Sequence, residues 1–130
     1  MKLPPLRRVA GLLSVMMVCA VSQAADFSAG KAVYQKHCQA CHQPAGTGMK
    51  GIFPPFAGNP NIQGQPAHIA TVILKGLSGP MTVNGDAYNG TMPPLSYISD
   101  KDISDVIGFI LNEWGGGGGT LNEDEIKALR

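Results

Sequence analysis

The sequence predicts an all-α fold in which three to four helices are separated by long irregular loops. Three segments repeat apolar residues with the period of an α-helix, and residues 99–114 give the clearest pattern. No segment sustains the alternation typical of a strand, and we expect at most a minimal hairpin around Asn84-Gly85. Residues 43–64 and 78–96 are rich in glycine, proline and turn signals, so we expect loops there.

The first two predicted helices have recognisable ends. The first covers residues 27–38, and Ser28 is expected to cap its N-terminus. The second covers residues 66–76, where Pro66 suits the first helical position and Gly76 suits the end.

The third predicted helix is followed by a short tail. Ser99 is expected to cap this helix, and the five glycines of residues 115–119 are expected to end it. Residues 115–130 are expected to form a glycine-rich linker and a short helical tail. In that tail, Thr120 and Glu123 have the spacing of a capping box.

Residues 1–24 are typical of an export signal peptide. The segment starts with three basic residues, continues with an uncharged and mostly apolar stretch over residues 9–20, and ends with small residues before a cleavage site after Ala24. The apolar stretch is short for a bilayer crossing, which takes about 20 residues. We therefore expect a periplasmic mature chain that begins near Ala25, without stable membrane insertion. The alternative is an uncleaved anchor.

The composition excludes one class of partner and points to a need for extra stabilisation. Lys and Arg number 10 against 9 for Asp and Glu, a net charge of +1, whereas nucleic-acid-binding proteins normally have a strong basic excess. The chain has 17 glycines, 10 prolines and only 6% aromatic residues. Such a small chain often needs a metal, a disulfide or a cofactor besides its apolar core.

One pentapeptide has the residues needed to bind a cofactor: Cys38-Gln39-Ala40-Cys41-His42. Two thiols three positions apart near a helical turn can form thioether bonds with two vinyl groups along one edge of a haem. The histidine that follows offers a neutral imidazole nitrogen as an axial ligand to the iron. The motif predicts one covalently attached haem c, bound through Cys38, Cys41 and His42.

Two other functions of the cysteine pair are less consistent with the sequence. A thiol–disulfide redox pair of the thioredoxin kind needs a βαβ context, which the sequence lacks. A zinc site needs further ligands, but there is no second cysteine pair, and His37 and His68 are poorly spaced for one.

The second axial ligand decides whether the haem carries electrons or binds a small molecule. Met92 precedes Pro93-Pro94, and the two prolines stiffen the backbone that presents the thioether. Met81, which follows Pro80, is the next candidate. Three further candidates have less suitable positions in the chain: Met49, His37 and His68.

With these residues in place, the chain resembles the class I (monohaem) cytochromes c over residues 25–114. The stretch 76–94 looks like that of bacterial cytochromes or cytochrome domains that accompany periplasmic dehydrogenases and reductases. Four features carry the resemblance, in chain order: the first helix with Gly30 and Tyr34, the Cys38–His42 motif, the Met92-Pro93-Pro94 loop and the amphipathic helix that ends at Trp114.

The resemblance implies a cytochrome c fold, with helices wrapped around the haem over residues 25–114. It also implies that Gly30 lets the first helix cross the last one closely, near Phe109. A carbonyl within Phe53-Pro54-Pro55 would accept a hydrogen bond from the His42 ring, with the choice between Pro54 and Pro55 left open. Trp114 would pack on the haem or form a hydrogen bond near it.

These expectations lead to a periplasmic one-electron carrier rather than an enzyme. With His42 and Met92 on the iron, no position remains for a substrate. The partners would be redox proteins of a respiratory chain, a dehydrogenase or membrane complex on one side and a terminal reductase or oxidase on the other, and the carrier would be a monomer. The expected apolar walls of the haem pocket are Ile52, Phe53, Phe56, Ile73, Leu77, Leu95, Ile107 and Ile110.

Three alternatives remain at this stage. The chain could be a dedicated cytochrome subunit of a periplasmic dehydrogenase or reductase complex. It could be a haem protein with an open sixth position at the iron. A disulfide oxidoreductase is the most distant alternative.

Overall fold

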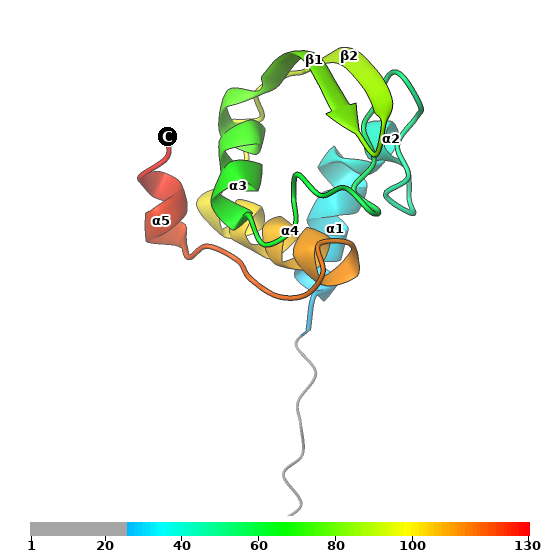
Figure 1. Cartoon of the computed structure of the whole chain (residues 1–130). Helices are drawn as coiled ribbons and strands as arrows, with labels where there is room; N and C mark the ends of the chain where they lie inside the picture. The colour runs from blue at the N-terminus through cyan, green and yellow to red at the C-terminus, as the bar shows by residue number, and fades with distance from the viewer. Residues whose placement is uncertain (1–25) are drawn as a thin grey trace, which may run out of the picture.

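The computed structural model describes residues 26–130, so the predicted signal segment and the start of the mature chain lie outside the described residues. Helices and strands follow one another in the order α1 (Ser28–His37), α2 (Gln39–His42), α3 (Pro66–Lys75), β1 (Leu77–Val83), β2 (Asp86–Met92), α4 (Asp100–Glu113) and α5 (Glu123–Lys127). In Figure 1, α1 and α2 lie on one side, α3 on the other, α4 below and the hairpin above. Among these residues, no helix is long and apolar enough to span a membrane.

Helices α1 and α4 form the centre of the fold. The apolar face of α4 is buried along its whole length, because its apolar residues repeat with helical spacing. The crossing with α1 is close at Gly30, where a Cβ atom would lie 2.7 Å from the Cβ of Phe109 and closer still to the carbonyl oxygen of Asp105. The expectation that Gly30 permits this crossing is confirmed.

The predicted N-terminal residues were right at α3 and α4, whereas the predicted Ser28 cap of α1 was wrong. Helix α3 begins at Pro66, and Ser99 caps α4 by accepting a hydrogen bond from the Asp102 amide at 3.1 Å. Ser28, however, is the first residue of α1 and not its cap. Phe27 is at the N-cap position without a capping side chain, and the Asp26 carboxylate accepts a hydrogen bond from the Ser28 amide at 2.9 Å.

A well-formed hairpin replaces the loop expected over residues 78–96. Strands β1 and β2 pair antiparallel from Leu77 opposite Met92 to Val83 opposite Asp86. Asn84 and Gly85, at the turn, both have positive φ, at 52° and 85°, as a tight two-residue hairpin turn requires. The alternation of apolar and polar residues that marks a strand is weak here, because only Val83 and Tyr88 of the fourteen strand residues are buried.

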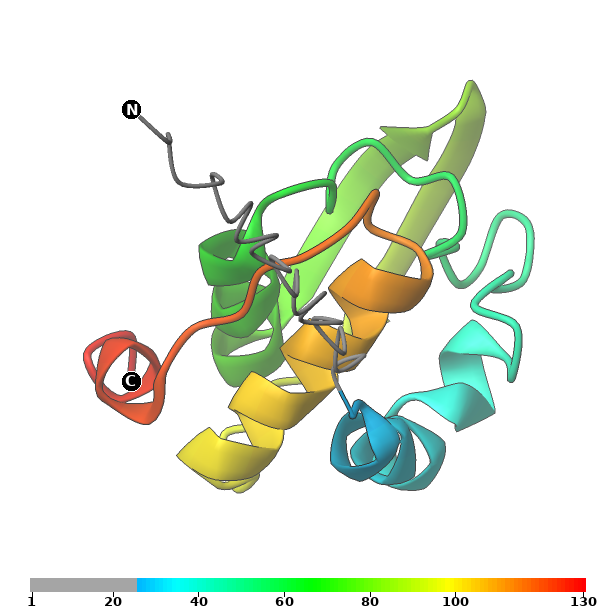
Figure 2. The same cartoon turned by 90° about the horizontal axis from the view of Figure 1, so that it is seen from below.

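The tail after the glycine run is folded, although its cap differs from the predicted one. Thr120 does not form a capping box with Glu123. Asn122 and Glu125 form it, because the Asn122 side chain accepts from the Glu125 amide at 2.9 Å and the Glu125 carboxylate accepts from the Asn122 amide at 2.8 Å. The Thr120 hydroxyl instead donates to the Ser104 carbonyl of α4 at 2.7 Å. Figure 2 shows the tail returning along α4 to the start of that helix.

Candidate haem site

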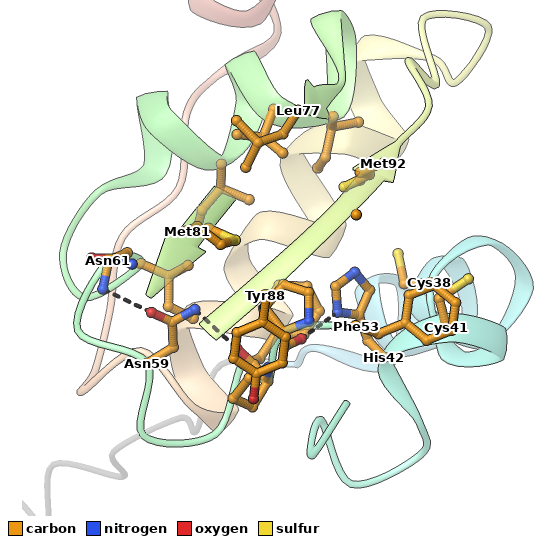
Figure 3. A pocket seen from close by; sticks show the side chains of 18 of the residues that line it. Cys38, Cys41, His42, Phe53, Asn59, Asn61, Leu77, Met81, Tyr88 and Met92 are labelled. Atoms are coloured by element: carbon orange, nitrogen blue, oxygen red, sulfur yellow. Dashed lines mark hydrogen bonds between the residues drawn. The ribbon is translucent and has the colours of Figure 1, made fainter. Parts of the chain in front are cut away.

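A cavity lies between the helices and the hairpin. Its walls include the Cys38–His42 motif, the loop around Phe53, helix α3, the inner face of the hairpin, the segment that follows Met92, and Ile110 of α4. Most of the lining side chains are apolar, and Figure 3 shows the thiols, the imidazole and the methionine thioethers around the same space. The chain therefore gathers its sulfur and imidazole donors around one apolar chamber.

The two cysteines are presented on a single helical turn. Helix α1 ends at His37, and the amides of Cys41 and His42 donate to the Cys38 carbonyl at 3.2 and 2.9 Å. Cys38 is half-buried and Cys41 is exposed, and both line the cavity. Burial, with a smaller effect of Cys41, raises the pKa of the Cys38 thiol to about 12. A redox-active thiol needs a lowered pKa, so this environment argues against a disulfide oxidoreductase.

The His42 imidazole is held by the backbone of the following loop. Its Nδ1 lies 2.9 Å from the Pro54 carbonyl oxygen and donates to it, so the lone pair resides on Nε2. Figure 3 shows this second nitrogen directed into the cavity. The choice left open by the sequence falls on Pro54, because the Pro55 carbonyl accepts from the Asn59 side chain at 2.9 Å instead.

Burial also sets the charge of this imidazole. His42 is only 8% exposed, and desolvation lowers its pKa, an effect that the Pro54 hydrogen bond partly opposes. The neutral ring that results keeps a free lone pair, which is the form that binds a metal.

Aromatic side chains support His42 from behind. The Phe56 ring lies 4.3 Å from the imidazole, centroid to centroid, and Trp114 stacks on Phe56 at 5.8 Å with an interplanar angle of 12°. Tyr34 packs against both rings and donates from its hydroxyl to the Gln43 carbonyl at 2.7 Å. Trp114 is not among the residues that line the cavity, and its ring packs against Phe56.

Met81 and Met92 both line the cavity from the inner face of the hairpin. They lie on paired strands rather than in the irregular loop that the sequence suggested, because the Asn84-Gly85 turn extends the pairing to the ends of both strands. Met81 pairs with Tyr88, four positions before Met92, which separates the two along the ladder by about 13 Å. Figure 3 shows Met92 across the cavity from His42, on the side of Cys38, and Met81 at the far end.

The other candidates for the second axial position are less well placed. Met49 is 46% exposed and does not line the cavity. His37 and His68 contribute to its lining, but His68 is exposed, and Nδ1 of His37 lies 3.4 Å from the Tyr97 hydroxyl.

Most of the predicted walls are in place. Seven of the eight predicted residues line the cavity, whereas Ile107 is fully buried in the core between the helices. Sequence reasoning missed Ile69 and Val72, although they belong to the predicted apolar stripe of α3, and it missed Tyr88, which becomes visible only once the strand is known.

The site fits a haem in shape as well as in chemistry. Gly79 and Gly90 pair with each other in the middle of the inner face, so no side chain fills the space between Met81 and Met92. A Cβ on Gly79 would meet no protein atom within 4 Å. A flat apolar group can therefore approach the backbone of the hairpin there.

Comparison with known proteins identifies the family. The sequence pattern of the family described as cytochrome c matches residues 27–114, most of the chain. The chain belongs to the cytochrome c family. It is therefore a monohaem cytochrome of class I that carries a covalently bound haem c with iron, and its function is electron transport.

This cytochrome is similar to a protein of which it covers most of the length and to longer dehydrogenase subunits of which it covers a small part. Cytochrome c-552 of Thermus thermophilus is 34% identical over 110 residues, which cover 78% of this chain and 83% of the relative. The cytochrome c subunit of alcohol dehydrogenase (quinone) of Gluconobacter oxydans is 37% identical over 106 residues, 79% of this chain. The gluconate 2-dehydrogenase cytochrome c subunit of Pantoea cypripedii is 30% identical over 109 residues, 81% of this chain. The cytochrome spans 22% and 24% of the lengths of these two dehydrogenase subunits.

Proposed function

We propose that this cytochrome is an exported, periplasmic one-electron carrier in which Cys38 and Cys41 bond to the haem and His42 and Met92 ligate its iron. The single observation that carries the proposal is that these four side chains line one apolar cavity, with the His42 imidazole already oriented by Pro54. When bound, the haem supplies a reversible ferric–ferrous couple. The proposal assigns residues 25–114 to the haem domain, and it assigns no catalytic residue.

The protein residues would set the properties of that couple. A thioether from Met92 favours reduced iron more than a second imidazole does, and this raises the reduction potential. The apolar walls exclude water and act in the same direction. If His42 and Met92 both bind the iron, no position would remain for a substrate, and this would favour a carrier over an enzyme.

A second candidate is a dedicated cytochrome subunit of a dehydrogenase complex. The similarity to the cytochrome c subunits of alcohol and gluconate dehydrogenases favours it. The similarity to cytochrome c-552 over most of that protein's length favours the free carrier. Purification of the natural protein at physiological salt distinguishes them, because a carrier elutes as a small monomer and a subunit elutes with a large partner.

The axial ligation is tested with two methionine variants. We expect Met92→Ala to lose the long-wavelength charge-transfer band of methionine-ligated ferric haem, to bind cyanide readily in the ferric form and to have a much lower midpoint potential. Met81→Ala is the matched control, since its thioether lines the same cavity, and it should retain the band. The opposite outcome, with loss of the band only in Met81→Ala, would assign the ligand to Met81. A wild-type protein without the band that binds CO readily would have an open sixth position.

A further inference from the structure

We propose that residues 120–130, here called the tail clasp, hold the chain segment that follows Met92 and so keep the Met92 thioether on the iron. This inference rests on the proposed ligation by Met92. The tail clasp lies beyond residues 27–114, the part matched by the cytochrome c family. The proposal therefore concerns residues that the family match does not cover.

Within the tail clasp, the Arg130 guanidinium bonds to three groups of residues 96–100. Arg130 donates to the carbonyl oxygens of Ser96 and Ile98 at 2.6 and 2.7 Å. It also forms an ion pair with the Asp100 carboxylate at 2.7 Å, and its side chain is only 33% exposed. Because the planar guanidinium offers five donors in a fixed geometry, this single residue connects the backbone and the side chain of residues 96–100 to the tail.

The segment held by Arg130 is continuous with the proposed ligand. Only three residues separate Met92 from Ser96, and two of them are prolines, so little slack exists between the two. The third of these residues, Leu95, donates from its amide to the Ile73 carbonyl of α3 at 2.7 Å. Arg130 and the Leu95 hydrogen bond therefore both anchor the short stretch of chain that follows Met92.

The clasp also contacts the opposite side of Met92. Lys75, at the end of α3, donates from Nζ to the Arg130 carbonyl at 2.9 Å. The neighbouring Gly76 lies directly against the ligand segment, because a Cβ there would be 2.7 Å from the Met92 carbonyl oxygen and 3.0 Å from the Pro94 nitrogen. Arg130 thus connects the two stretches of chain between which the backbone of Met92 is held.

The rest of the clasp is anchored firmly enough to perform this role. Ile126 is fully buried in the main core, and Ser104 of α4 donates to the Leu121 carbonyl at 2.6 Å. The capping box of Asn122 and Glu125 fixes the start of α5. The Arg130 contacts therefore extend from a docked helix, and movement of residues 96–100 must break them.

An added ligand measures how often Met92 leaves the iron. Imidazole binds ferric iron only in molecules whose thioether has dissociated, so its apparent affinity rises with the population of that open state. A contact that exists only while Met92 is on the iron disfavours the open state. Its loss raises the population of the open state, and the apparent dissociation constant of imidazole falls by the same factor.

The test is an imidazole titration of the full ferric holoprotein, followed through the charge-transfer band. We expect Arg130→Ala to lower the apparent dissociation constant about tenfold. Arg130→Lys should give a smaller decrease in this constant, because an ammonium group keeps the charge but cannot reproduce the planar arrangement of guanidinium donors. Thr120→Val is the matched control, since it removes the hydrogen bond to Ser104 at the other end of the clasp. It should lower the free energy of unfolding and change the imidazole constant by less than about twofold.

Two results would overturn the proposal. One is an unchanged imidazole constant in Arg130→Ala, or in Arg130→Lys should the alanine variant fail to fold. The other is an equal decrease in Thr120→Val at an equal loss of unfolding free energy, which would make the effect one of general stability.

Met92→Ala separates this inference from the ligand assignment. If it behaves as wild type towards imidazole, the assignment fails, and if it binds imidazole more tightly while Arg130→Ala does not, the clasp alone fails.

Discussion

Helices α1 and α4 pack closely against each other, whereas the hairpin of β1 and β2 is mostly exposed and turns its inner face to the cavity. Seven residues of α4 are buried, and its crossing with α1 leaves no room for a Cβ at Gly30. The hairpin buries only Val83 and Tyr88. Its outer contacts are few and polar, such as the bond from the Asn84 side chain to the Gly58 carbonyl at 2.8 Å. In the proposed site, the haem would be the packing partner of this inner face.

The largest effect should come from the attachment cysteines. In a variant with both Cys38→Ala and Cys41→Ala, no covalent haem can form, and a pyridine haemochrome spectrum of the denatured chain should be blank. Hydrogen exchange of the same protein sharpens the comparison, because the hairpin amides should lose protection before those of α4. Equal loss in both regions would mean that the helices depend on the haem as much as the hairpin does.

Gly30→Ala should break the helical region directly. The added methyl group meets the backbone of Asp105 and the Cβ of Phe109, so α1 and α4 must move apart. We expect a loss of about 3 kcal/mol in the free energy of unfolding, measured with guanidinium chloride. Gly108→Ala on α4 is the matched control, because its Cβ would lie 3.5 Å from Phe27, an ordinary contact. It should leave stability unchanged or raise it by about 1 kcal/mol, and an equal loss in both would argue against crowding as the cause.

Gly79→Ala should have a smaller effect that is confined to the haem. Gly79 has a φ of 104°, so a side chain there costs about 1–2 kcal/mol in backbone strain. Gly51→Ala is the control, with a φ of 79°, no protein atom within 4 Å of its Cβ and no place in the cavity wall. Both variants should lose similar stability, but only Gly79→Ala should alter the haem absorption spectrum. A normal spectrum in Gly79→Ala would place the haem away from this part of the hairpin.

Sequence reasoning succeeded where local pattern determines structure. Helices α3 and α4 have a clear apolar period, and their ends at Pro66 and Ser99 follow from capping chemistry. The attachment motif is contiguous, so the placement of Cys38 and His42 at one cavity could be predicted from spacing alone.

Features that depend on tertiary contacts could not be predicted in this way. The hairpin has Gly79 opposite Gly90 and a proline at position 80, so its pairing is carried by backbone hydrogen bonds and not by an alternating pattern. Pro54 and Pro55 are chemically alike, and only the path of the loop decides which carbonyl reaches His42. The contacts of Arg130 with residues 96–100 join positions about thirty residues apart and leave no local signal.

The hydrogen bond from His42 to Pro54 also has an energetic consequence for the redox couple. A carbonyl acceptor makes the imidazole a stronger electron donor, and a stronger donor stabilises the ferric state. The thioether proposed on the other side of the iron stabilises the ferrous state. The working voltage of this cytochrome would then be the balance of two opposed ligands, and the length of one backbone hydrogen bond would be a means of adjusting it.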